Sequence, residues 1–143
     1  MKLVDANVLL YAVNRDSVYH IRLRRWWEDT VGSDEPVGLC WMVLLAFLRI
    51  ATHPGVFPQP LTVAQAAATV SRWLSHPNVR VVTELEQHWG VLRGLLHETG
   101  TAANLTADAH LAAMAITHGA VLVSCDADFA RFQGLRWENP LTT

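Results

Sequence analysis

Four aspartates of the sequence stand at the ends of apolar segments, where their carboxylates could bind a metal ion. Asp5 follows Lys-Leu-Val, Asp108 lies in Ala-Asp-Ala-His-Leu-Ala-Ala, and Asp126 and Asp128 follow Val-Leu-Val-Ser-Cys. An acid just beyond a buried parallel strand lies at the strand's carboxyl edge, where open α/β sheets build their sites. Carboxylate oxygens suit Mg²⁺ or Mn²⁺, and several carboxylates in one cleft repel one another unless a cation or a proton neutralises them. The sequence therefore predicts a divalent-metal site.

Each aspartate also has a purely structural explanation. Asp108 would complement the dipole of the helix that it begins. Asp5, Asp126 and Asp128 would each cap the residues that follow them. Independent caps would fall at one edge of a sheet only by coincidence, so we favour a shared site over separate caps.

A regular alternation of strands and helices must position these acids. Strands are predicted at residues 2–4, 37–40, 79–83 and 121–124, with an edge strand at 135–138. Helices are predicted at 7–13, 20–30, 41–52, 63–75, 86–98 and 107–118, with Thr62 and Thr106 as N-caps of the fourth and sixth. This alternation predicts a three-layer α/β/α fold with a central parallel sheet. If strands 2–4 and 121–124 are neighbours, Asp5 and Asp126 converge on one edge and Asp108 reaches the same cavity.

The apolar residues are expected to fill one core. Strand 79–83 is expected inside it, and helix 86–98 is expected to turn Trp89, Leu92, Leu95 and Leu96 inward. The chain has six tryptophans, for which packing in a core or an interface is a better explanation than base stacking. None of the seven histidines shows a metal-binding spacing, so structural roles are expected for them, including His110 on the helix of Asp108.

The composition fits one globular domain over residues 1–143. Hydrophobic residues make up 51% and charged residues 17% of the chain, and a formal charge of −2 does not point to any class of partner. Cys40 and Cys125 lack zinc-like spacing, which indicates reduced thiols of a cytosolic protein. The apolar stretch 41–48 is far shorter than the roughly 20 residues that cross a bilayer, and the N-terminus does not resemble a signal peptide. We therefore expect a cytoplasmic protein with no membrane contact.

Five sequence segments together resemble one family. These are D-A-N-V-L-L-Y-A-V-N, L-L-A-F-L-R-I-A-T-H-P, A-D-A-H-L-A-A-M-A-I-T-H-G-A, V-S-C-D-A-D-F and the C-terminal F-Q-G-L-R-W-E-N-P-L. In this order they resemble the PIN-domain ribonucleases, in particular the VapC toxins of toxin–antitoxin pairs, over essentially the whole chain. The resemblance implies a single PIN domain that is a Mg²⁺- or Mn²⁺-dependent endoribonuclease, with tRNA or rRNA as its substrate and a 5′-phosphate and a 3′-hydroxyl on the products.

The resemblance also assigns roles to individual positions. The acids that bind metal in the family are matched by Asp5, Asp108 and Asp126. Asp128 matches a further acid that binds metal through water or orients the attacking water, so that the expected catalytic set is all four aspartates. Asn7 fills the D-x-N position, where its amide would hold the Asp5 carboxylate, and Ser124 would hydrogen-bond within the acidic cluster.

The resemblance implies partners as well. It predicts a homodimer and a cognate VapB-type antitoxin whose apolar peptide lies in a groove near the site. RNA would need cationic side chains along its backbone. The candidates are Arg22, Arg24, Arg25, Arg72, Arg93 and Arg131.

One position departs from the family pattern. Ala46 stands where many members carry a glutamate, and an alanine binds no metal. The alternative function is therefore a PIN-fold module that binds RNA or its antitoxin but cleaves poorly. A phosphohydrolase of the haloacid-dehalogenase type is a weaker alternative, because Asn7 replaces the acid that such an enzyme needs and the later half of the chain has no lysine.

Overall fold

The computed structural model describes residues 1–100 and 102–142 and is built around a sheet of five parallel strands. Their order is β3 (Val79–Val81), β2 (Val37–Leu39), β1 (Lys2–Val4), β4 (Val121–Val123) and β5 (Trp137–Glu138). All four pairings are parallel. The predicted parallel sheet is confirmed, as is the edge position of the last strand.

Strands β1 and β4 lie side by side at the centre of the sheet, although most of the chain separates them. Their register pairs Lys2 with Val121 and Val4 with Val123. The Asp5 amide continues the ladder by donating a hydrogen bond of 2.9 Å to the Val123 carbonyl. Both strands therefore end at the same level, and the residues that follow them share one edge.

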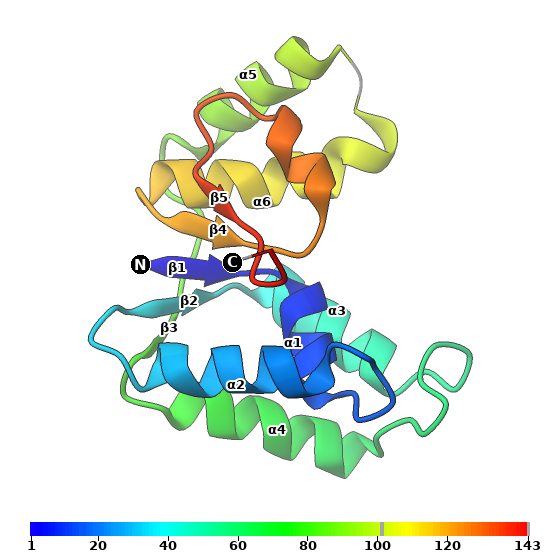
Figure 1. The fold of residues 1–143 in the computed structure, drawn as a ribbon. Coiled ribbons are helices and arrows are strands. Elements are labelled where there is room, and N and C mark those ends of the chain that lie inside the picture. The colour runs from blue at the N-terminus through cyan, green and yellow to red at the C-terminus, as the bar shows by residue number, and fades with distance from the viewer. Residues whose placement is uncertain (101, 143) are drawn as a thin grey trace.

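The helices cover the sheet in two groups. They are α1 (Ala6–Val13), α2 (His20–Val31), α3 (Trp41–Ala51), α4 (Val63–Ser75), α5 (His88–Thr99) and α6 (Thr106–Thr117), with short 3-10 helices η1 (Ala103–Leu105) and η2 (Ala127–Arg131). Figure 1 shows α1 to α4 with the half of the molecule that contains β2 and β3, and α5 and α6 with the half that contains β4 and β5. Helix α1 packs on α2 and α3, and α5 packs on α6. The predicted α/β/α architecture is confirmed.

Aromatic packing joins helices α2, α3 and α4. The ring of Trp73 lies 4.7 Å from that of Phe47 and 5.6 Å from that of Trp27, measured between centroids. Thr62 caps α4 as predicted, and a capping box with Gln65 satisfies two backbone amides that would otherwise lack partners. Tryptophan packing and the cap together fix α4 against the core.

Two expectations about the helices on the other half are wrong. Trp89 is 62% exposed, whereas Leu95 is buried. Helix α5 begins at His88. His88 is buried, whereas Trp89 was expected to be the buried residue. Thr106 does not cap α6, because the chain already turns through η1 and Thr106 is the first helical residue.

Strand β3 differs from its expected place in the core. It lies at the edge of the sheet, and Val81 is 41% exposed. An apolar Val-Arg-Val-Val run does not distinguish an edge strand from a central one, because its hydrogen bonds to a single neighbour are not visible in the sequence. None of the helices in the described part of the chain is long and apolar enough to cross a membrane.

Candidate active site

The Asp5 carboxylate is fixed on both of its oxygens at the end of β1. Asp5 is the N-cap of α1, and its Oδ1 accepts a hydrogen bond of 2.7 Å from the Ala6 amide. Its Oδ2 accepts hydrogen bonds from the Ser124 hydroxyl at 2.7 Å and the Asn7 amide at 3.3 Å. The structure thus places Asn7 and Ser124 against Asp5, where the sequence expected them.

Ser124 connects the ends of β1 and β4. Its side chain is fully buried, and its Oγ accepts hydrogen bonds of 3.1 Å from Asn7 Nδ2 and from the Asp126 amide while donating to Asp5. These three bonds use the full capacity of a hydroxyl group. Asn7 Oδ1 in turn accepts from the Cys125 amide at 3.0 Å. The acids at the two strand ends are thereby held by one hydrogen-bond network.

Asp126 and Asp128 are placed by the turn that follows β4. Asp126 is the N-cap of η2, and its Oδ1 accepts a hydrogen bond of 2.9 Å from the Asp128 amide. Arg131, at the end of η2, forms an ion pair with Asp128, with 3.3 Å between Nη2 and Oδ1. The cap fixes the turn that carries both carboxylates, and the ion pair holds Arg131 against Asp128.

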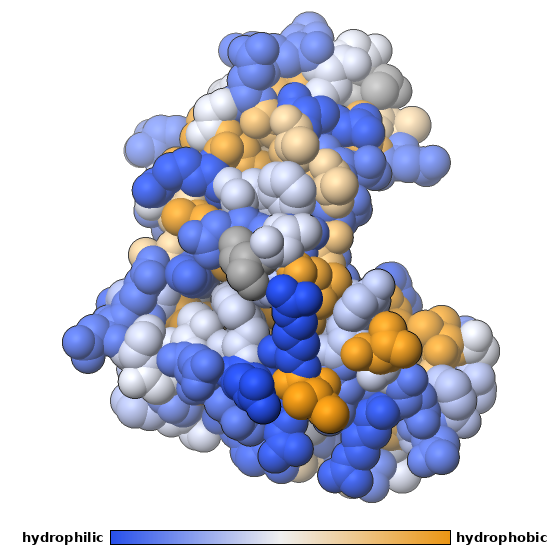
Figure 2. Space-filling model, viewed as in Figure 1, coloured by the Kyte–Doolittle hydropathy of each residue, from blue (hydrophilic) through white to orange (hydrophobic). Residues whose placement is uncertain are grey.

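Three carboxylates converge beside Asp5. One oxygen each of Asp108, Asp126 and Asp128 lie within 4.8 Å of one another. Asp108 reaches this group from the first turn of α6. Of the metal ligands expected from the family resemblance, Asp108 and Asp126 belong to this group, together with Asp128, and Asp5 adjoins it. All four acids lie at the carboxyl edge, on the side towards which the strands point in Figure 1 and where the surface is indented between the two halves in Figure 2.

The electrostatics of this cluster favour a bound cation. Burial, followed by the charges of Asp126, Asp5 and Asp128, raises the pKa of Asp108 to about 6, and Arg131 partly opposes that shift. The pKa of Asp5 is also raised, mainly by burial, although the hydrogen bond from Ser124 works against the shift. Carboxylates that hold protons more tightly than usual are ones whose negative charge is poorly compensated. Since all of the donors are hard oxygens, the set fits Mg²⁺ or Mn²⁺.

The end of β2 supplies no acid to this edge. The sequence has no Asp or Glu between Glu35 and Glu84, and Ala46 is a half-buried residue of α3. Cys40 occupies the strand end instead, and burial raises the pKa of its thiol, with further contributions from the charges of Asp5 and Glu84. The acids of the site therefore come from the ends of β1 and β4 and from α6.

A histidine pair behind Asp108 was not predicted. His88 Nε2 lies 2.9 Å from His110 Nδ1, and His110 Nε2 lies 3.5 Å from a Glu84 oxygen. The pair joins α5 to the helix that carries Asp108. The two histidines are 22 positions apart, so only the packing of α5 on α6 reveals the contact. The pKa of His88 is lowered by burial and then by His110.

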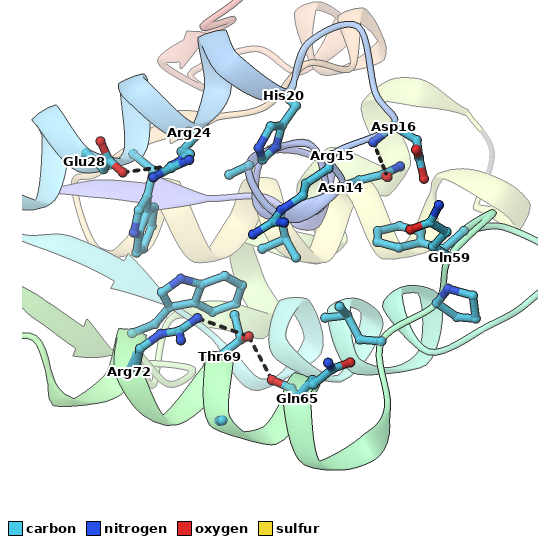
Figure 3. Close-up of a pocket in the computed structure, with 18 of the residues that line it drawn as sticks. Asn14, Arg15, Asp16, His20, Arg24, Glu28, Gln59, Gln65, Thr69 and Arg72 are labelled. Carbon is cyan, nitrogen blue, oxygen red and sulfur yellow. Dashed lines mark hydrogen bonds and ion pairs between the residues drawn. The ribbon is translucent and has the colours of Figure 1, made fainter.

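A groove of about 960 Å³ lies between α2 and α4, away from the four acids. Figure 3 shows Arg15 and Arg72 reaching into it from opposite walls. Trp27 and Trp73 form part of its lining. Ala12 and Val13, at the end of α1, also line it, so the helix that Asp5 caps ends at this groove.

Comparison with known proteins gives consistent relatives in sequence and in structure. The profile of the PIN domain family matches residues 2–135. Ribonuclease VapC37 of Mycobacterium tuberculosis is 47% identical over 140 residues, which cover 98% of this chain and 97% of the relative. Ribonuclease VapC33 of the same species is 45% identical over 141 residues, which cover 99% of each chain.

Two solved structures resemble the fold over nearly its whole length. VapBC2 from Rickettsia felis, bound to a DNA fragment from its promoter, has a TM-score of 0.71 at 18% identity, covering 96% of this chain and 97% of that one. Mycobacterium tuberculosis VapC20, described as a toxin that cleaves the sarcin–ricin loop, has a TM-score of 0.66 at 18% identity, covering 95% and 99%.

Proposed function

Because this chain belongs to the PIN-domain family as a VapC-type ribonuclease, we propose that it is an endoribonuclease that hydrolyses RNA with a bound Mg²⁺ or Mn²⁺ ion. The observation that carries this proposal is the convergence of Asp108, Asp126 and Asp128 beside Asp5 at one edge of the sheet. We further propose that residues 1–143 form one PIN domain and that tRNA or rRNA is the substrate. Because that substrate and the two free thiols fit the cytoplasm, we place its activity there.

The residues of the site would have different roles in the reaction. Asp108, Asp126 and Asp128 would hold the ion, and Asp5 would complete its shell or orient the attacking water. A bound ion would polarise the scissile phosphate and lower the pKa of a water molecule. Asn7 and Ser124 keep the Asp5 carboxylate in one orientation through their hydrogen bonds.

Asp128 compensates for the carboxylate that is missing at Ala46. The acid missing from α3 leaves fewer ligands on that side, but the Asp128 carboxylate joins the close group from η2. Three carboxylates within reach of one ion are enough for the usual protein share of a Mg²⁺ shell, since Mg²⁺ keeps several waters. We therefore favour an active nuclease over a module that only binds RNA or antitoxin.

The groove between α2 and α4 is the proposed site of a VapB-type antitoxin. Trp27 and Trp73 offer an apolar wall, and within the described chain no carboxylate lies within 4 Å of the guanidinium groups of Arg15 or Arg72. An apolar segment that carries an acid would complement both features. Several of the similar solved structures are VapBC assemblies, and this supports such a partner.

A homodimer is supported by exposed apolar side chains on α3 and beside α5. Trp41 and Leu45 lie one turn apart on α3 and are 50% and 59% exposed. Leu85 and Trp89 are also exposed. Large apolar residues that face solvent in groups are typical of protein interfaces.

Cleavage of total cellular RNA tests the proposed function directly. We expect discrete fragments with Mg²⁺ or Mn²⁺ and none with EDTA. Asp108→Asn should abolish them, whereas Asp34→Asn, at an exposed position in the turn before β2, should not. Binding of RNA without metal-stimulated cleavage by the unaltered protein would favour the alternative, a binding module.

A further inference from the structure

Arg131 is the cation that the fold places against the acidic cluster. Of the charged groups in the described chain that act on Asp108, only Arg131 lowers its pKa. Its side chain is 42% exposed at the end of η2. A guanidinium at the rim of a site for a polyanion is positioned to contact that polyanion.

The guanidinium is held along one edge and open along the other. Arg131 Nε donates a hydrogen bond of 3.1 Å to the Asp128 carbonyl, and Nη2 donates one of 3.3 Å to Asp128 Oδ1. A guanidinium has five N–H donors. Among the described residues the remaining donors have no protein acceptor, and they include the outer pair of N–H groups that binds phosphate in a bidentate manner.

The negative charge of the site opposes RNA binding unless a cationic side chain lies nearby. Four carboxylates repel the RNA backbone, and a single divalent ion compensates only half of their charge. Arg131 adds a positive charge at the rim without occupying the position between Asp108, Asp126 and Asp128. Asp128 would thus act in two ways, as a member of the acidic group and, through Oδ1, as the partner of Arg131.

We propose that Arg131 binds a backbone phosphate of the RNA next to the scissile one and that Asp128 positions it for this contact. This inference rests on the proposed ribonuclease function. It singles out one of the six candidate arginines, because the structure shows Arg131 paired with an acid of the cluster.

Binding of a fluorescently labelled single-stranded oligoribonucleotide tests the proposal by anisotropy, in EDTA and across a series of salt concentrations. We expect Arg131→Ala to bind about tenfold more weakly and to reduce the salt slope by about 0.7, the value for one phosphate contact on a single strand. Arg131→Lys should keep the slope but recover only part of the affinity, because lysine lacks the planar fork. Arg80→Ala, at an exposed position on the edge strand β3, should match the unaltered protein.

Calorimetric titration of Mn²⁺ into the same proteins separates phosphate binding from a structural role. Arg131→Ala should bind Mn²⁺ as tightly as the unaltered protein or more tightly, because a positive charge beside the ion is gone. RNA affinity and salt slope equal to those of the unaltered protein would overturn the inference, and so would loss of RNA and Mn²⁺ binding together. If the unaltered protein neither binds nor cleaves RNA, the proposed function itself fails. If it does both and Arg131→Ala binds RNA equally well, only this inference fails.

Discussion

The Ser124 hydroxyl donates a hydrogen bond of 2.7 Å to Oδ2 of Asp5, although the two residues are 119 positions apart in the sequence. The bond joins the ends of β1 and β4 and orients an acid of the proposed metal site. Substitution of Ser124 by alanine removes this donor, leaves the Asp126 amide without its acceptor and takes from Asn7 Nδ2 the shorter of its two hydrogen bonds.

Ser124→Ala should therefore reduce both stability and activity. We expect the free energy of unfolding to fall by about 1–3 kcal/mol, the usual cost of leaving buried polar groups unpaired. Urea denaturation measures the first effect, and the RNA cleavage rate measures the second. Ser75→Ala is a matched control, since Ser75 is exposed and far from the acids. An unchanged cleavage rate in Ser124→Ala would show that Asp5 needs no support from Ser124.

The raised pKa of Asp108 predicts a specific pH dependence. Because its folded pKa of about 6 lies above the reference value of 3.8, the folded state binds the additional proton. In metal-free protein, the contribution of Asp108 to stability is then most favourable below the reference value and is lost as the pH rises to about 6. Metal-free Asp108→Asn should lose that part of the pH dependence in denaturation experiments, and a slope unchanged from the unaltered protein would contradict the assignment.

The affinity for Mn²⁺ should also depend on the protonation of Asp108, but it should rise with pH where the stability falls. A proton on Asp108 competes with the ion, so Mn²⁺ affinity should fall as the pH drops through about 6. Titrations at about pH 5 and about pH 7.5, on either side of the Asp108 pKa, measure this effect. An affinity independent of pH over this interval would exclude Asp108 from the ligands.

The cationic groove predicts the effect of a charge reversal on antitoxin binding. Arg72→Glu places an acid opposite the acid expected on the partner, so affinity for the cognate antitoxin should fall by at least about tenfold. RNA cleavage by the free protein should be unchanged, because Arg72 lines the groove and not the acidic cluster. Arg93→Glu, on the exposed side of α5, serves as the control. Equal antitoxin affinity in both variants would place the antitoxin elsewhere.

Restoring the acid on α3 provides a further prediction. Ala46→Glu would add a carboxylate on the side where the chain supplies none, so we expect tighter Mn²⁺ binding and faster cleavage, with Ala46→Gln as an uncharged control of equal size. Ala46 is half-buried, and the longer side chain should cost about 1–3 kcal/mol if it packs poorly. If both variants behave alike, the position lies outside the metal site.

Much of the fold followed from local sequence patterns. The end of β1 at Val4 was predicted, and the end of β4 at Val123 was predicted to within one residue, because short apolar runs are directly followed by polar residues. The convergence of Asp5 and Asp126 followed from the rule that parallel strands end at one edge. That Asp128 rather than Asp5 joins Asp108 and Asp126 in the close group was not predictable, because it depends on the turn of η2, in which the Asp128 amide bonds to Asp126 Oδ1.

Contacts between distant segments account for the other differences. The burial of His88 and the exposure of Trp89 depend on where α5 starts relative to α6, and hydropathy alone favours the tryptophan. The edge position of β3 depends on the order of strands in the sheet. The groove between α2 and α4 arises from the spacing of two helices, which local periodicity does not report.

Calorimetric titration of Mn²⁺ into the unaltered protein and Asp126→Asn tests the central claim most directly. The asparagine amide oxygen can still accept the hydrogen bond from the Asp128 amide, so the substitution removes the charge while keeping the cap of η2. We predict saturable Mn²⁺ binding by the unaltered protein and by the control Asp34→Asn, with at least about tenfold weaker binding by Asp126→Asn. Equal Mn²⁺ affinity in all three proteins, or no binding by the unaltered one, would contradict the account.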